Sequence, residues 1–308
     1  MNRQAARWGA ERSPSAGCWS AEELVDVKER SGESVGVVIP ARDEEASVGE
    51  VVERIRGELM ETAPLVDELV VMDSLSSDGT ADRARRSGAV VHSVAQVRSD
   101  LGVYAGKGEA LWKSLFVTSS SVLVFVDADL TEWGPHFVTG LLGPLLGDQK
   151  TLLVKGFYDR VLDIGGEPST QGGRVTELVA RPLLAMRWPE LSAVVQPLAG
   201  EWAIRRSLFE RLSVPVGYGV EFATLVDTWS QHGLAAIAQV DLGRRGHRHQ
   251  TVHDLGLMAT EILAVADSRS GLPAPREVEL AQYGRSAPGG WQTREVPTWE
   301  RPPAVTVA

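Results

Sequence analysis

One short segment constrains the chain most, because residues 122–130 join an apolar run to two aspartates in Val-Leu-Val-Phe-Val-Asp-Ala-Asp-Leu. The run predicts a fully buried strand. Residues i and i+2 of a strand share a face, so Asp127 and Asp129 point to one spot at its carboxyl end, where open α/β sheets bind ligands. Two such carboxylates favour a hard divalent ion and a diphosphate site. The alternative is a turn or helix cap with two solvated acids.

The composition indicates a soluble enzyme. The chain has 308 residues, 43% of them hydrophobic, enough for one large or two ordinary domains. No apolar run approaches the roughly 20 residues of a membrane helix, and residues 1–17 lack the apolar core of a signal peptide. Cys18 is the only cysteine, which favours a cytoplasmic location. The net charge of −10 argues against nucleic-acid binding, and an anionic substrate would need local positive charge.

Apolar strands alternate with helical patterns along the first half of the chain. The predicted strands are 36–39, 69–72 and 122–126, and the predicted helices are 44–60, 78–87 and 107–119. This alternation predicts βαβ units, an α/β fold and a mostly parallel sheet. Beyond Leu130 the predicted helices are 136–147, 174–187, 206–212, 219–232 and 252–268, with strands near 151–156 and 236–241. Residues 270–308 show no periodicity and are expected to form a mobile tail.

A polar cluster follows each of the three early strands. Pro40-Ala41-Arg42-Asp43-Glu44-Glu45 follows the first, and Asp73-Ser74-Leu75-Ser76-Ser77-Asp78-Gly79-Thr80 follows the second. Taken singly, each cluster is as readily explained by turn chemistry and helix capping. Together, on successive strand ends, they would line one crevice. Their acids would accept hydrogen bonds from a base or a ribose, and the serines leave room for a ring.

The same clusters resemble the nucleotide half of GT-A glycosyltransferases. Three further segments narrow the resemblance: Gly106-Lys107-Gly108-Glu109-Ala110-Leu111-Trp112, residues 173–183 (Gly-Arg-Val-Thr-Glu-Leu-Val-Ala-Arg-Pro-Leu), and Gly217-Tyr218-Gly219-Val220-Glu221. From about residue 20 to 268 the chain resembles the actinobacterial glucosyl-3-phosphoglycerate synthase family. The resemblance implies a GT-A nucleotide-diphosphosugar transferase fold, with a mixed, mostly parallel sheet flanked by helices. It also implies a homodimer and retaining transfer of glucose from UDP-glucose to 3-phosphoglycerate.

The resemblance implies a role for each matching residue. Asp129 and His247 would hold a divalent ion, Mg²⁺ or Mn²⁺, which neutralises the departing diphosphate. Catalysis would use Lys107, Leu198 and Glu221, with the departing phosphate taking the acceptor proton. The donor would be bound by Pro40, Ala41, Glu44, Asp73, Ser74, Lys107, Asp127 and Ala128. The acceptor would be bound by Gly173, Arg174, Thr176 and His249, where glycine N–H groups and a guanidinium suit an anion.

These assignments divide the chain into four parts. Residues 1–20 are expected to form a flexible leader. Residues 21–130 form the nucleotide-sugar-binding half and residues 131–269 the acceptor-binding half of one GT-A domain, and 270–308 are the tail.

Departures from the family pattern leave the substrates open. His247-Arg248-His249 stands where the family has His-Arg-Asn, and Leu75 and Arg42 lie where the base would be bound. One alternative is therefore a specialised member in lincosamide antibiotic biosynthesis, which would transfer a sugar from a GDP-sugar to the thiol of ergothioneine. The quaternary ammonium of that acceptor would favour nearby aromatic groups such as Trp188 or Trp202. Another alternative is a non-catalytic nucleotide-sugar-binding protein.

Overall fold

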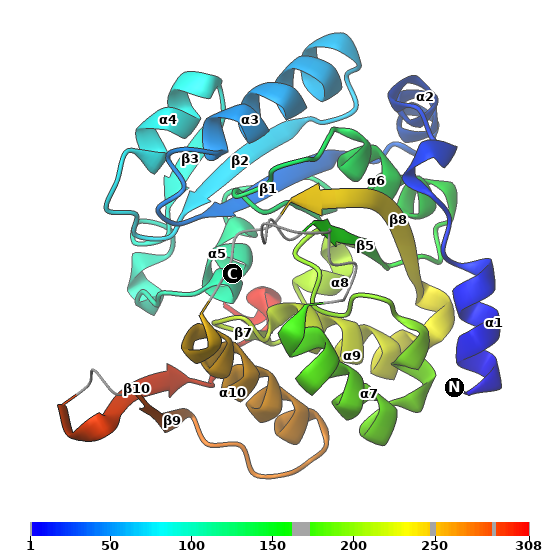
Figure 1. The fold of residues 1–308 in the computed structure, drawn as a ribbon. Helices are drawn as coiled ribbons and strands as arrows, with labels where there is room; N and C mark the ends of the chain where they lie inside the picture. Colours follow the sequence, from blue (N-terminus) through cyan, green and yellow to red (C-terminus); the bar gives the residue numbers. More distant parts are fainter. Residues whose placement is uncertain (1, 162–172, 247–250, 285–287, 308) are drawn as a thin grey trace.

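A seven-stranded mixed sheet forms the centre of the molecule (Figure 1). The computed structural model describes residues 2–161, 173–246, 251–284 and 288–307. The strand order is β3-β2-β1-β4-β6-β5-β8, and only β6 runs antiparallel to its neighbours. This confirms the predicted α/β class and the mixed, mostly parallel sheet. The strands are β1 (Val35–Ala41), β2 (Glu68–Asp73), β3 (Val90–Ser93), β4 (Val122–Phe125), β5 (Leu153–Val161), β6 (Trp202–Arg205) and β8 (Ile237–Gly246).

Both faces of the sheet are covered, which explains why the predicted strands are continuous apolar runs rather than alternating ones. Val37 and Ile39 of β1 pack into one hydrophobic core and Val38 into the other. The first core holds side chains of α2 (Ala21–Ser31), α3 (Val48–Arg56), α4 (Thr80–Ser87) and α6 (His136–Gly147). The second holds side chains of α5 (Lys107–Ser114), α7 (Arg181–Arg187), α9 (Val220–His232) and α10 (Val252–Arg269).

The parallel register brings the three polar clusters to one edge of the sheet. Ala41 at the end of β1 lies opposite Asp73 at the end of β2, and Val38 of β1 lies opposite Phe125 at the end of β4. The two expected halves, 21–130 and 131–269, meet in this same sheet, where β4 pairs with β6. The segments after the parallel strands are therefore neighbours in space.

The helix predictions match the structure except at their ends. The predicted helix 44–60 is α3 followed by a π-helical turn, Gly57–Thr62, and the predicted 206–212 is only the short α8 (Arg206–Phe209). The predicted 107–119 ends at Ser114. Among the described residues, none of the helices combines the length and the hydropathy that a membrane span requires.

The prediction of a flexible leader at residues 1–20 is wrong. Residues 3–11 form α1 (Arg3–Glu11), whose Trp8 is only 6% exposed and donates from Nε1 to the carbonyl of Ile237 at 2.9 Å. The chain then follows β8, where Gln239 N donates to Arg12 O. Ala5 and Trp8 are the two residues that this helix buries, and two positions are too few to create a recognisable periodic pattern in the sequence.

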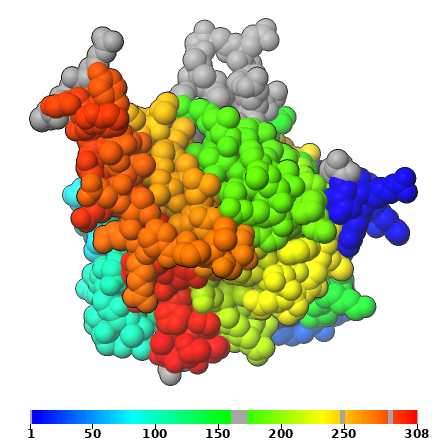
Figure 2. Space-filling view, turned by 90° about the horizontal axis from the view of Figure 1, so that it is seen from below, coloured from blue at the N-terminus to red at the C-terminus, as the bar shows by residue number. Residues whose placement is uncertain are grey.

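The prediction of a mobile tail at residues 270–308 is also wrong for the residues described there. β9 (Glu277–Tyr283) and β10 (Trp291–Pro297) form an antiparallel hairpin, which projects beside α10 in Figure 2. Farther on, β11 (Glu300–Arg301) pairs with β7 (Val214–Pro215). Arg301 is buried against Glu109 of α5. Its charge is neutralised by a residue far away in the sequence, which composition alone does not show.

Replacing Trp8 by alanine should lower the free energy of unfolding by about 3 kcal/mol, because it removes a buried indole and its hydrogen bond. Urea unfolding measures the change. Arg7→Ala is the matched control, since the Arg7 side chain on the same helix is 79% exposed and should change stability by less than ~0.5 kcal/mol. Equal stabilities of the two variants would show that α1 does not pack on the body in solution.

Candidate active site

A cleft of about 350 Å³ opens at the carboxyl edge of the parallel strands. Its wall combines residues from the ends of β1, β2, β4 and β8 with residues of α5, α9 and α10. Most of the predicted site residues lie on this wall: Pro40, Ala41, Glu44, Ser74, Lys107, Asp127, Ala128, Asp129, Gly173, Arg174, Thr176, Leu198 and Glu221. The structure thus brings together residues as far apart in the sequence as Pro40 and Glu221.

The segments after β1 and β2 form one wall of the cleft. Asp73, at the end of β2, is buried behind the cleft surface, and Ser74 lies on that surface. Within the described residues, Asp73 Oδ1 and Ser74 Oγ are buried without a hydrogen-bond partner. Burying polar atoms without a hydrogen bond costs free energy unless a ligand supplies the missing hydrogen-bond partner. Asp43 accepts a hydrogen bond from Ser77 N at 2.7 Å and ties the two segments together.

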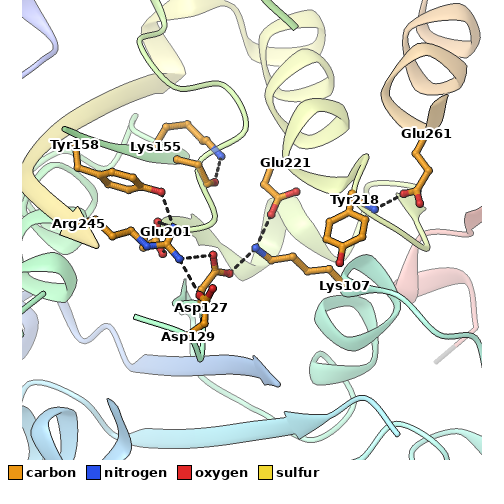
Figure 3. A network of polar contacts seen from close by, with 11 residues as sticks. Lys107, Asp127, Asp129, Lys155, Tyr158, Glu201, Tyr218, Glu221, Arg245 and Glu261 are labelled. Atoms are coloured by element: carbon orange, nitrogen blue, oxygen red, sulfur yellow. Dashed lines mark hydrogen bonds and ion pairs between the residues drawn. The ribbon is translucent and has the colours of Figure 1, made fainter. Parts of the chain in front are cut away.

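Lys107 sits at the first position of α5 and points into the cleft (Figure 3). Its Nζ lies 2.6 Å from Asp127 Oδ1 and 2.8 Å from Glu221 Oε1. Glycines on both sides let α5 start here: a Cβ on Gly106 would lie 2.2 Å from Val216 O, and one on Gly108 would lie 1.8 Å from Pro215 O. The lysine is therefore held by close backbone packing and by two carboxylates.

Arg245 was not predicted as a site residue, although it occupies the centre of the polar network in Figure 3. Its Nη2 lies 3.1 Å from Asp127 Oδ2 and 2.9 Å from Asp129 Oδ1. Its Nη1 lies 2.7 Å from Tyr158 Oη and 3.2 Å from Glu201 Oε1. The basic run at residues 244–248 was the available signal, because alternation along β8 turns Arg245 inward and Arg244 outward.

Two acids of this network, Asp127 and Glu201, have pKa values shifted in opposite directions, one by neighbouring charges and the other by burial. Burial alone would raise the pKa of Asp127, but the charges of Lys107 and Arg245 hold that pKa well below its usual range. Burial raises the pKa of Glu201, which lies deeper behind Arg245. Asp127 is therefore a carboxylate held between two cations, an arrangement that a bound anion would reorganise.

A buried lysine, Lys155, supports the loop after η5 (Pro189–Ala193). Lys155 of β5 donates from Nζ to Ala199 O at 2.7 Å, and burial lowers its pKa to about 7. Ala199 lies between Leu198 and Gly200, which both line the cleft. A Cβ on Gly200 would lie 2.2 Å from Asp127 Oδ2, so only glycine lets this loop approach the carboxylate. Neither Lys155 nor Gly200 was predicted.

The opposite wall of the cleft mixes polar and apolar groups. Gly173, Arg174 and Thr176, at the start of the helical segment before α7, face residues of α10. From α10 come the apolar side chains Leu255, Met258 and Ile262 and the carboxyl of Glu261. The sequence predicted α10 as a helix but gave no indication that it lines the site.

Glu261 is the one acid that α10 contributes to this wall. It accepts a hydrogen bond from Tyr218 N. Burial raises its pKa to about 7, as does the charge of Glu221, although the N–H groups of Tyr218 and Gly219 oppose this.

Only one of the two predicted metal ligands, Asp129, lies within the described residues. Asp129 lines the cleft, and its side chain is 24% exposed. His247, the other expected ligand, and His249, the expected acceptor residue, lie outside the described residues. Within the described parts of the chain, no group of three or more His, Cys, Asp or Glu side chains is arranged to hold a metal.

Glu261 should make stability depend on pH. Its pKa is about 7 in the folded protein and 4.5 ordinarily, so its stabilising contribution is full below about pH 4.5 and is lost as the pH rises through about 7. Between pH 5 and pH 8, Glu261→Gln should therefore gain on the order of 2 kcal/mol of unfolding free energy relative to wild type.

Urea unfolding at several pH values measures this difference. Glu295→Gln, which alters an exposed carboxyl on β10, is the control and should follow wild type. A constant difference between Glu261→Gln and wild type across this range would contradict the assignment.

Comparison with known proteins places the cleft in a family. The family model described as glycosyl transferase family 2 matches residues 36–212. Glucosyl-3-phosphoglycerate synthase of Mycolicibacterium paratuberculosis is 44% identical over 309 residues, covering 97% of this chain and 92% of that protein. The Mycobacterium tuberculosis protein of the same name is 47% identical over 276 residues, covering 88% and 82%.

A crystal structure of the Mycobacterium tuberculosis glucosyl-3-phosphoglycerate synthase, in complex with Mn²⁺, UDP-glucose and phosphoglyceric acid, superposes with a TM-score of 0.84. The identity is 44%, and the match covers 94% of this chain and 96% of that one. These matches confirm the resemblance drawn from the motifs, together with the GT-A fold. The chain is a glycosyltransferase of family 2 and belongs to the glucosyl-3-phosphoglycerate synthase family.

Proposed function

We propose that this enzyme transfers glucose from UDP-glucose to 3-phosphoglycerate with retention of configuration and with Mn²⁺ bound. One observation supports this most: a single cleft holds both a cluster of paired charges, Lys107, Asp127, Asp129 and Arg245, and the Arg174 segment. The relative from Mycobacterium tuberculosis has been crystallised with Mn²⁺, UDP-glucose and phosphoglyceric acid, and also with UDP and glucosyl-3-phosphoglycerate.

The nucleoside would bind along the segments after β1 and β2. Asp73 Oδ1 and Ser74 Oγ, buried without partners among the described residues, would be completed by the N–H and hydroxyl groups of the nucleoside. Pro40, Ala41, Glu44 and Ala128 would shape this part of the cleft. Lys107 would then face the diphosphate, where a compact point charge suits phosphate oxygens.

Asp129 fits a divalent cation. Its carboxylate reaches the cleft, and the chain leading to His247 lies beside it, because Gly246 N donates to Thr131 O at 2.8 Å. Oxygen with imidazole is a donor set that suits Mn²⁺ well and also admits Mg²⁺. When bound, the ion would neutralise negative charge on the leaving diphosphate. Arg245 now holds Asp129 Oδ1, so ion binding would require this guanidinium to share or release that oxygen.

The remaining cleft residues fit front-face transfer. The bond between the sugar C1 and the diphosphate oxygen breaks, the acceptor hydroxyl oxygen bonds to C1, and its proton passes to the departing phosphate. Glu221, fixed by Lys107 at 2.8 Å, and the Leu198 backbone would stabilise positive charge on the sugar. Gly173 N–H, Arg174 and Thr176 would hold the anionic acceptor, and His249, which lies outside the described residues, keeps its expected role toward the same acceptor.

The alternative acceptor, ergothioneine with a GDP-sugar donor in antibiotic biosynthesis, has one observation in its favour. Glu261 of α10 and Tyr218 both line the cleft, and a carboxylate with an aromatic ring can bind a quaternary ammonium group. The two aromatic residues that the sequence suggests for this role, Trp188 and Trp202, are instead buried in the core. Membership of a transferase family and the intact charge cluster leave the non-catalytic hypothesis without support.

We also infer a cytoplasmic homodimer. Cys18 is the only cysteine, which excludes an intrachain disulfide and suits a reducing compartment. The hairpin of β9 and β10 exposes Tyr283 and Trp291, which are 58% and 59% exposed and lie ring to ring at 5.7 Å. A projecting aromatic pair of this kind is typical of a surface that another chain covers.

Light scattering after size exclusion should give twice the monomer mass, and Tyr283→Ser with Trp291→Ser should shift it toward the monomer because the aromatic contact is lost. Arg7→Ala, on the exposed face of α1, is the control and should leave the mass unchanged. A monomeric wild type would contradict the dimer.

Assaying several nucleotide sugars against several acceptors, with Mn²⁺ present and products identified by mass spectrometry, tests the reaction. Wild type should transfer glucose from UDP-glucose to 3-phosphoglycerate, and Asp129→Ala should lose at least about 100-fold in kcat while keeping its unfolding midpoint. Transfer only from a GDP-sugar to a thiol would establish the alternative. Full activity of Asp129→Ala in EDTA would exclude the metal site.

A further inference from the structure

Arg301, near the end of the chain, contacts the donor side of the site from behind. It is 5% exposed, and its Nε and Nη2 each lie 2.7 Å from an oxygen of Glu109, which is fully buried. Its Nη1 donates to Leu101 O at 2.7 Å, and its Nη2 lies 3.3 Å from Gly102 O. In Figure 2 the C-terminal residues, in red, lie against the cyan segment around α5. One guanidinium therefore holds a side chain and two backbone carbonyls.

These contacts lie on both sides of Lys107 in the sequence. Glu109 follows Lys107 in the first turn of α5, whereas Leu101 and Gly102 precede it. The connecting residues 102–105 are exposed and have no regular structure. Two of them are nevertheless held: Gly102 through its carbonyl, and Tyr104 through its ring, which lies 4.9 Å from the Arg301 guanidinium and packs on Trp299 at 4.0 Å. Arg301 is thus the anchor of a loop that ends at the cleft.

The charge balance explains why this anchor matters. Glu109 has a second cation nearby, Lys113 at 3.3 Å, but the Lys113 ammonium also donates to Val94 O and Gly102 O. Arg301 supplies the two short bonds to the carboxylate. Removing one partner of a buried ion pair leaves the other charge desolvated, so the surrounding chain must rearrange to solvate it.

The same C-terminal segment also holds the loop that faces Lys107. β11 pairs with β7, and Trp299 O accepts a hydrogen bond from Val216 N at 3.3 Å. The carbonyls of Val216 and Gly217 accept hydrogen bonds from Glu109 N and Gly108 N. This loop leads to Glu221, the second carboxylate on Lys107. The start of α5 and the 214–219 loop are therefore bonded directly to each other, and the C-terminal segment contacts both: β11 pairs with β7, and Arg301 bonds Glu109.

We propose that Arg301 is a positioning residue for donor binding: by fixing the loop before α5 and the Glu109 side chain in its first turn, it places the Lys107 ammonium where the diphosphate binds. The inference rests on the proposed role of Lys107 toward the donor. It gives the C-terminal segment a function in substrate binding, although none of its described residues lies on the cleft wall.

The test compares three purified full-length variants with wild type. Arg301→Gln should raise the dissociation constant of UDP with Mn²⁺, measured by calorimetry, and the KM for UDP-glucose by about tenfold or more, while the acceptor KM changes less than about twofold. Arg301→Lys keeps the positive charge but lacks the planar guanidinium that bonds both carboxylate oxygens. It should therefore recover part of the lost UDP affinity. Lys107→Ala should weaken UDP binding at least as much as Arg301→Gln.

Arg205→Gln is the matched control for general destabilisation. Arg205 is equally buried, lies 2.6 Å from Glu33 and donates to the carbonyls of Thr151 and Leu145, but at the opposite edge of the sheet. It should lower the unfolding midpoint as Arg301→Gln does and leave UDP binding unchanged. If Arg301→Gln fails to fold, Glu109→Gln carries the same expectation.

The binding results distinguish failure of the role inferred for Arg301 from failure of the role proposed for Lys107. If Lys107→Ala weakens UDP binding but Arg301→Gln or Glu109→Gln does not, Arg301 is structural only and the inference is overturned. If Lys107→Ala itself leaves UDP binding unchanged, the proposed role of Lys107 fails, and the inference fails with it. Equal weakening of UDP binding by Arg205→Gln and Arg301→Gln would also overturn it, because the effect would then follow from lost stability alone.

Discussion

Asp127 lies between two cations, Lys107 at 2.6 Å and Arg245 at 3.1 Å, and this buried charge alternation organises the whole cleft. The three residues come from the end of β4, the start of α5 and the end of β8, so they meet only when the sheet has its observed strand order. Burying isolated charges of this kind would be strongly unfavourable, whereas alternating them makes the cluster tolerable. The surrounding glycines at 106, 108 and 200 follow from the same requirement, because each lets backbone approach closely enough to complete the cluster.

The cluster also explains how an acidic chain can bind anionic substrates. With a net charge of −10, the protein as a whole repels phosphates, yet Lys107 and Arg245 already stand at the cleft paired to carboxylates. In the proposed reaction, a nucleoside diphosphate with a divalent ion would offer each group a new partner: phosphate oxygens for the cations and a metal for Asp129. Binding would then exchange one set of ion pairs for another rather than create charge in an empty site. Such preorganisation limits the reorganisation that transfer of a sugar would otherwise require.

The sequence predicted those elements and residues that are marked by a local residue pattern or by a motif of the family. Apolar runs such as 122–126 predicted the strands, and polar clusters at their ends predicted one wall of the cleft, including Asp127 and Asp129. The resemblance of residues 106–112 to the family predicted Lys107. Residues that act through distant partners were not predictable in this way. Arg245 looked like part of an ordinary basic run, Lys155 like one more lysine in a strand, and Glu261 like a polar position on an amphipathic helix. Trp8 and Arg301 were missed for the same reason, since single anchors produce no periodicity. His247 and His249 lie outside the described residues, and their assigned roles stay predictions.

We expect Asp129, now paired with Arg245 at 2.9 Å, to exchange this partner for a divalent ion when the nucleoside diphosphate binds. A direct measurement is to titrate the wild-type protein with Mn²⁺ and to follow free Mn²⁺ by electron paramagnetic resonance with and without saturating UDP. Mn²⁺ should bind weakly to the protein alone and at least about tenfold more tightly with UDP, because the phosphates would compensate Arg245 and release the carboxylate. Equal affinity for Mn²⁺ with and without UDP would contradict the exchange.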